Sequence, residues 1–136
     1  MEDFVSFDLA KKLKEKGFDG KVSAYYKDTN KIFNTGNASN LNILTGAHSA
    51  PTISQVLKWL REEKKIYVEP CILADADTDA DGKVINEYTY WSFSVTHVET
   101  GDMIYFEYER IDDKRFDSYE LAALAGIEYV LDNDVI

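Results

Sequence analysis

Four aspartates alternate with small residues between Asp75 and Gly82, and such a row of carboxylates could bind a hard cation. In an EF-hand loop, carboxylates at positions 1, 3 and 5 bind calcium, a glycine follows at position 6, and a glutamate at position 12 contributes two oxygens. The chain matches the first four of these positions with Asp77, Asp79, Asp81 and Gly82. Position 12 holds a tyrosine, so any calcium binding is expected to be weak.

The expected calcium ligands are the carboxylates of Asp77, Asp79 and Asp81 and the backbone carbonyl of Lys83, with Glu87 added only if the loop departs from EF-hand geometry. A second interpretation needs no cation. An Asp-Gly pair favours a hairpin turn, and the flanking segments look like strands, whereas an EF-hand needs helices on both sides. The sequence therefore leaves two hypotheses, a weak calcium loop and a solvated hairpin.

No catalytic constellation accompanies these aspartates. The single cysteine, Cys71, could form a thiol dyad with His48 or His97. No basic group or helix N-terminus near it would lower its pKa, so we expect a buried and inert thiol. His97 is expected on the core face or rim of a strand, and nothing near His48 requires a functional role. The motifs of nucleophile elbows, phosphate loops and dinucleotide-binding turns are missing. The sequence thus predicts no catalytic residue, no cofactor other than calcium, and a protein that is not an enzyme.

Charge divides the chain into two unequal halves. Residues 1–65 contain 11 Lys/Arg and 8 Asp/Glu, a net charge of +3 (11 − 8), whereas residues 66–136 contain 4 Lys/Arg and 17 Asp/Glu, a net charge of −13 (4 − 17). Most of the molecule would repel a DNA duplex, so no binding to duplex nucleic acid is expected. The asymmetry predicts a surface with two electrostatic faces, or self-association of one face with the other.

Length and composition favour one compact domain over residues 1–136, because 45% of the residues are hydrophobic. The first residues lack the basic and apolar regions of a signal peptide, and no apolar run reaches the roughly 18 residues of a membrane span. One cysteine permits no internal disulfide. We therefore expect a cytoplasmic protein that does not enter a membrane.

Three segments carry helix patterns with identifiable start signals. Ser6 is the expected cap of a first helix that ends near Lys16, and Thr52 forms a capping box with Gln55 at the start of a second helix. A third helix follows Asp117, its expected cap. The small residues of this last helix predict close packing of its backbone against a sheet.

The remaining segments predict an α+β fold. Residues 34–50 look irregular, and Leu41, Ile43 and Leu44 are expected to pin their middle to the core. We expect an antiparallel sheet of about five strands with three helices packed mainly on one face, in the order α-β-β-α-β-β-β-α. The expected strands are residues 21–27, 31–33, 66–73, 86–98 and 103–110.

The last two expected strands are aromatic on both faces. If a two-residue turn at 100–101 joins them, Val95 lies opposite Phe106 and faces the core. The opposite face then needs a cover of its own, such as a binding partner. The candidate interaction residues on that face are Tyr88, Tyr90 and Tyr105.

The chain resembles a family of small uncharacterised proteins encoded by gut bacteria and their phages in three segments: Phe4–Phe18 (FVSFDLAKKLKEKGF), Pro51–Ile66 (PTISQVLKWLREEKKI) and Tyr119–Asn133 (YELAALAGIEYVLDN). These segments coincide with the expected helices. The resemblance implies a phage or mobile-element origin, and it brings no activity, cofactor or catalytic residue. The acidic octapeptide is not part of the family pattern.

Divided charge, clustered tyrosines and missing catalytic motifs favour a non-catalytic protein-interaction module, which binds an unknown protein or a second copy of itself. Two alternatives remain. One is a weak calcium-binding protein that uses residues 75–87. The other is an acidic DNA mimic that inhibits a DNA-binding protein through the carboxylates of Glu107, Glu109, Asp112 and Asp113.

Overall fold

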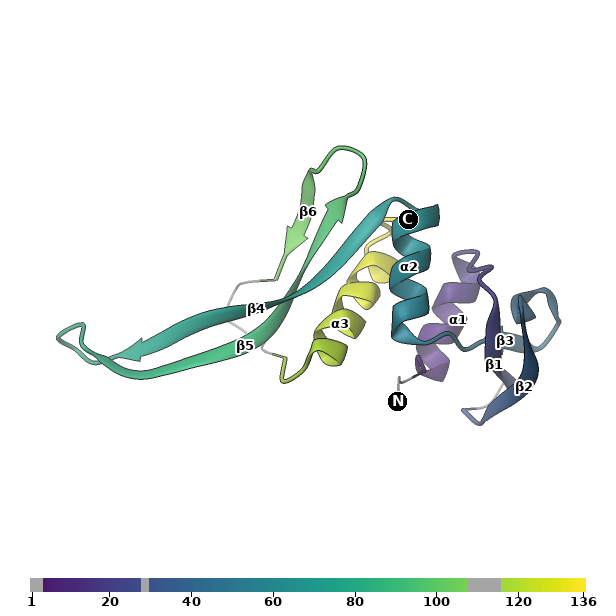
Figure 1. Cartoon of the computed structure of the whole chain (residues 1–136), viewed down its shortest axis with the longest axis horizontal. Coiled ribbons are helices and arrows are strands. Elements are labelled where there is room, and N and C mark those ends of the chain that lie inside the picture. Colours follow the sequence, from purple (N-terminus) through teal and green to yellow (C-terminus); the bar gives the residue numbers. More distant parts are fainter. Residues whose placement is uncertain (1–3, 28–29, 108–115) are drawn as a thin grey trace.

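The computed structural model describes residues 4–27, 30–107 and 116–136 (Figure 1). Within these residues the chain forms three α-helices, one 3-10 turn and two antiparallel sheets of three strands each. The α+β class is thereby confirmed, whereas the expected single sheet of about five strands is wrong. The helices are α1 (Phe7–Glu15), α2 (Ile53–Glu63) and α3 (Tyr119–Asp132). The first sheet contains β1 (Val22–Lys27), β2 (Ile32–Ser39) and β3 (Ala47–Ser49), the second contains β4 (Ile66–Thr78), β5 (Val84–His97) and β6 (Met103–Phe106), and the 3-10 turn η1 covers Leu41–Ile43.

The first sheet has the strand order β2-β1-β3, with β1 paired antiparallel to both neighbours. Residues 34–50, which were expected to be irregular, supply most of β2, all of η1 and all of β3. Their Asn-rich and Gly-containing composition has a low strand propensity, but pairing with β1 outweighs it. Leu41 is buried as expected, but Ile43 and Leu44 are exposed, so one of the three expected anchors reaches the core.

The helix starts agree with the sequence to within one residue. The caps of α1 and α2, Ser6 and Thr52, are confirmed, because each side chain accepts a hydrogen bond from the backbone amide three residues later. Gln55 completes the capping box of α2. The cap of α3 is Ser118 rather than Asp117. Both residue types are good caps, so their adjacency left the pattern ambiguous at this position.

Helix α3 packs closely against strands β4 and β5 (Figure 1). A Cβ atom added at Gly126 would lie 2.4 Å from Cγ1 of Val68 and 3.1 Å from Cδ2 of Phe93. Ala122 and Ala123 on the same helix are fully buried. The expected close approach of a small-residue helix to a sheet is therefore confirmed.

The β4–β5 hairpin is much longer than the helices that cover it. Its paired residues run from Ile66 with His97 to Thr78 with Val84. Strand β4 thus extends five residues beyond its expected end (78 against 73), and the outer part of the hairpin projects away from the helices (Figure 1). Strand β4 lies at the edge of the second sheet. This position explains how Pro70 fits within a strand, since proline cannot donate to the ladder and occurs on edge strands.

The pairing of β5 with β6 differs from the expected register. Val95 pairs with Tyr105 and not with Phe106. The connection is longer than a two-residue turn, because the amide of His97 donates to the carbonyl of Asp102 (2.9 Å), and a bulge follows. A shift of one residue moves a side chain to the opposite face of a strand. Tyr105 consequently lies on the same face as Val95, toward the core.

Candidate interaction surfaces

The outer part of the β4–β5 hairpin, residues 72–90, forms a two-stranded arm that extends beyond the helices (Figure 1). Its exposed aliphatic side chains are Ile72 (58% exposed), Val84 (49%) and Ile85 (66%). It also contains five Asp/Glu residues and one Lys, a net charge of −4 (1 − 5). An isolated two-stranded ribbon is marginally stable in water, so the arm depends on the core at its base.

The aspartates of the acidic stretch occupy two different structures. Asp75 and Asp77 belong to strand β4 and pair with Tyr88 and Asn86 on β5.

The hairpin turn follows this strand end. There Oδ1 of Asp79 accepts hydrogen bonds from the backbone amides of Asp81 and Lys83, both at 2.9 Å. The acidic stretch is therefore a strand end and a hairpin turn, and the expectation of a loop throughout is wrong.

The expected calcium ligands are not gathered around one point. Glu87 pairs with Ala76, whereas Asp77 pairs with Asn86, so Glu87 and Asp77 project from opposite faces of the arm. The carboxylate of Asp79 points into the hairpin turn, where it accepts hydrogen bonds from two backbone amides. Among the described residues, no group of three or more His, Cys, Asp or Glu side chains could hold a metal ion.

Two of the three expected interaction tyrosines are neighbours on the arm. The rings of Tyr88 and Tyr90 lie 6.3 Å apart between centroids, and both residues are half-buried. They pair with Asp75 and Leu73 across the hairpin. This face of the arm therefore combines aromatic, aliphatic and acidic side chains.

Tyr105, the third expected interaction residue, lies elsewhere. Its ring stacks on Tyr129 of α3 at 4.0 Å, and its hydroxyl donates a 2.5 Å hydrogen bond to Oε2 of Glu107. The prediction that it shares a face with Tyr88 and Tyr90 is wrong, because the bulge changed the register of β6.

One of the four carboxylates of the DNA-mimic hypothesis does not lie on the surface. Glu107 is buried, with 6% of its surface exposed, so it is not part of an acidic surface. Glu109, Asp112 and Asp113 lie outside the described residues.

The cysteine and the histidines do not form a dyad. Cys71 pairs with Ser92, whereas His97 pairs with Ile66, about 16 Å farther along β4. His48 is on β3 of the other sheet. Burial raises the pKa of the half-buried Cys71 thiol, and the Glu69 carboxylate raises it further. A raised pKa lowers the thiolate fraction at neutral pH. The expectation of a buried thiol is wrong, because Cys71 is only half-buried.

The first sheet carries a hollow that was not predicted from the sequence. It has a volume of about 360 Å³ and lies where η1 and the following turn lean over β1. Beside it, Leu44 is 51% exposed and Ile43 77% exposed. The apolar run at 41–44 was the available signal, but it was assigned to the core. The residues that line the hollow are Tyr25, Lys27, Thr35, Leu41, Leu44, Thr45, Gly46 and Ala47.

Within the described ranges, no helix has the length and apolar character needed to cross a membrane. No protein-family model matches the chain, and neither the curated proteins nor the solved structures include a significantly similar one. The resemblance to small phage and gut-bacterial proteins therefore stays a prediction.

Proposed function

We propose that the protein is a non-catalytic interaction module of the cytoplasm, and that the arm is its binding element. The observation that carries this proposal is the exposure of Ile72, Val84 and Ile85 on a ribbon that extends beyond the helices. Exposed aliphatic side chains surrounded by charges are typical of surfaces that bind other proteins. The single cysteine fits a reducing compartment.

The chemistry of the arm defines the kind of partner. Its net charge of −4 favours a surface with Lys or Arg around its rim, and its aliphatic side chains need an apolar centre to be buried. In the part of the chain that the structure describes, the edge of β4 that faces away from β5 also offers backbone donors and acceptors to an extended segment of a partner. We therefore expect a basic protein surface with an apolar groove.

A shortened arm tests this function. Residues 75–88 are replaced by Asn-Gly, which joins Ala74 to Thr89, a directly opposed pair in the hairpin. Asn-Gly is the preferred two-residue turn between paired strands, so the core hairpin should close as before. The full-length protein should retain a set of basic host proteins on an affinity column, and the shortened variant should lose them.

Two controls make the experiment decisive. The shortened variant must show the cooperative unfolding of the parent, so that loss of binding reflects the arm alone. Retention should also decrease with salt, because exposed charges are screened over about 8 Å at physiological ionic strength. Equal retention by both proteins would contradict the proposal, as would turnover of a small molecule by the purified chain.

A further inference from the structure

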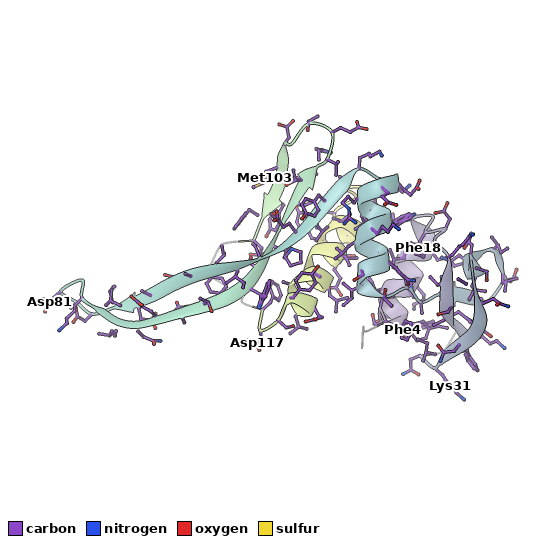
Figure 2. The ribbon with its side chains drawn as sticks, viewed as in Figure 1. Phe4, Phe18, Lys31, Asp81, Met103 and Asp117 are labelled. Carbon is purple, nitrogen blue, oxygen red and sulfur yellow. The ribbon has the colours of Figure 1, made fainter. Side chains whose placement is uncertain are left out.

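The two ends of the molecule carry opposite charge around apolar side chains. Asp81 lies at the tip of the arm and Lys31 beside the first sheet, near the opposite end of the long axis (Figure 2). The arm has a net charge of −4 around its exposed aliphatic residues. The hollow of the first sheet is apolar, with Lys27 in its lining.

The surface next to the hollow is both aromatic and basic. The rings of Tyr25 and Phe33 stack at 5.6 Å on neighbouring strands. The ammonium groups of Lys27 and Lys31 lie 5.2 and 5.4 Å from the centroid of the Phe33 ring. Lys14 does not add to this surface, because its ammonium group donates to the carbonyl oxygens of residues 44 and 47.

We infer that the arm of one copy docks into the hollow of a second copy. The inference rests on the proposed function of the arm and names its partner. Aliphatic side chains of the arm would cover the hollow beside Ile43 and Leu44, and its carboxylates would meet Lys27 and Lys31. An apolar centre with a complementary charged rim is the usual anatomy of a specific interface.

The positions of the two surfaces determine the kind of assembly. They lie at opposite ends of the long axis, so one molecule cannot join its own arm to its own hollow (Figure 1). The contact is head-to-tail, and each added copy leaves one free arm and one free hollow. Such heterologous contacts form open chains when the rotation between copies does not close a ring.

Sedimentation of the full-length protein tests the inference. The mean mass should rise with protein concentration and fall with added salt, because the contact is small and charged. Replacing Lys27 and Lys31 by Glu should weaken self-association about tenfold or more. Replacing Asp81 at the tip and Glu87, which shares a face of the arm with Ile72, by Lys should do the same.

Mixing the two charge-reversed proteins provides the sharpest outcome. Each should be monomeric alone, and an equimolar mixture should associate, because the acidic arm of one meets the lysines of the other. The matched control replaces Lys21 and Lys58, exposed lysines away from the hollow, by Glu and should self-associate like the parent protein. It carries the same change in net charge.

Failure of this inference is distinguishable from failure of the proposed function. A parent protein that stays monomeric, or a mixture that stays monomeric, overturns self-docking. Suppose that the parent protein is monomeric but retains host proteins on the column, and that the shortened variant does not. The arm is then a binding element for another partner. If self-association occurs but survives removal of residues 75–88, the inference is wrong, and the role of the arm is still decided by whether the shortened variant loses host proteins.

Discussion

Tyr26 shows how a single side chain connects the first sheet to the beginning of the chain. It is 8% exposed, and its hydroxyl donates a 2.8 Å hydrogen bond to the carbonyl of Val5. The rings of Phe7 on α1 and Tyr26 pack in a T-shaped arrangement, with 5.5 Å between their centroids. Burial raises the pKa of the Tyr26 phenol, because the phenolate would lose its hydration. The neutral, donating form is therefore part of the folded structure.

Replacing Tyr26 by Phe should lower the free energy of unfolding by about 1 kcal/mol, the usual net contribution of one buried hydrogen bond. Because the pKa is raised in the folded state, the stabilisation is fully present below the ordinary phenol pKa and is lost as the pH rises through the folded pKa. Urea unfolding of both proteins at neutral and alkaline pH measures this. A difference between them that does not shrink at alkaline pH would disprove the assignment.

Calcium binding is expected to be weak, with no saturable heat below about 1 mM calcium in calorimetry. The reason is that Asp79 already accepts two backbone amides and Glu87 lies on the opposite face from Asp77. The variants Asp79→Ala and Asp81→Asn separate the two hypotheses. In a calcium loop both lose binding heat, whereas in a hairpin turn only Asp79→Ala changes the protein, by loosening the tip without calcium. Tight binding abolished by both substitutions would contradict the turn assignment.

At the scale of elements, local chemistry was predictable and strand pairing was not. The caps Ser6 and Thr52 follow from residues within one turn of each other, and their helices start where expected. Strand β3 has three residues and depends on β1 for its hydrogen bonds, so nothing local identifies it. Asp75 and Asp77 suggested a loop, yet both lie within a strand, because pairing with β5 outweighs their low strand propensity. The pairing partner of Tyr105 was predicted wrongly for a similar reason, since a bulge has no reliable sequence pattern.

The packing of α3 makes Gly126 a sensitive position. An alanine there gains about 1 kcal/mol of helix propensity, but its methyl group would lie 2.4 Å from Val68. Overpacking costs of about 1–3 kcal/mol are typical, so we expect Gly126→Ala to be destabilising by thermal and denaturant unfolding.

A double-mutant cycle with Val68→Ala should show that the second substitution relieves part of the first, because it removes the clashing methyl groups. Strict additivity of the two effects would mean that the helix does not lie where the structure places it.

At the scale of the molecule, the three helices lie between the first sheet and the arm (Figure 1). An ion pair of 2.8 Å between Lys12 and Asp132 links α1 to the end of α3, and one of 2.6 Å between Lys16 and Asp134 links the residues that follow these helices. Exposed pairs of this kind contribute little, so the apolar core between the helices holds the two sheets in one body. The division of charge read from the sequence has a spatial counterpart, because the acidic arm and the lysines of the first sheet are far apart (Figure 2).

This charge distribution leads us to expect no binding of duplex DNA at physiological salt. Affinity for a duplex comes mainly from neutralisation of phosphates, and residues 66–136 carry an excess of 13 negative charges (17 − 4). A mobility-shift assay at micromolar protein checks this. A shifted band that disappears steeply with salt would refute it, and the Lys27→Glu and Lys31→Glu protein would show whether the first sheet was responsible.

The pairing of Thr78 with Val84 at the far end of the arm has a consequence for local motion. Beyond the helices, the two strands are held mainly by their own backbone bonds, so they can separate from the turn inward while the core stays folded. Amide hydrogen exchange should then form a gradient, fastest beside the turn and slowest near Val68 and Val95. The arm would thus open from its tip toward a base that stays folded. A partner that binds the tip would slow amide exchange there first.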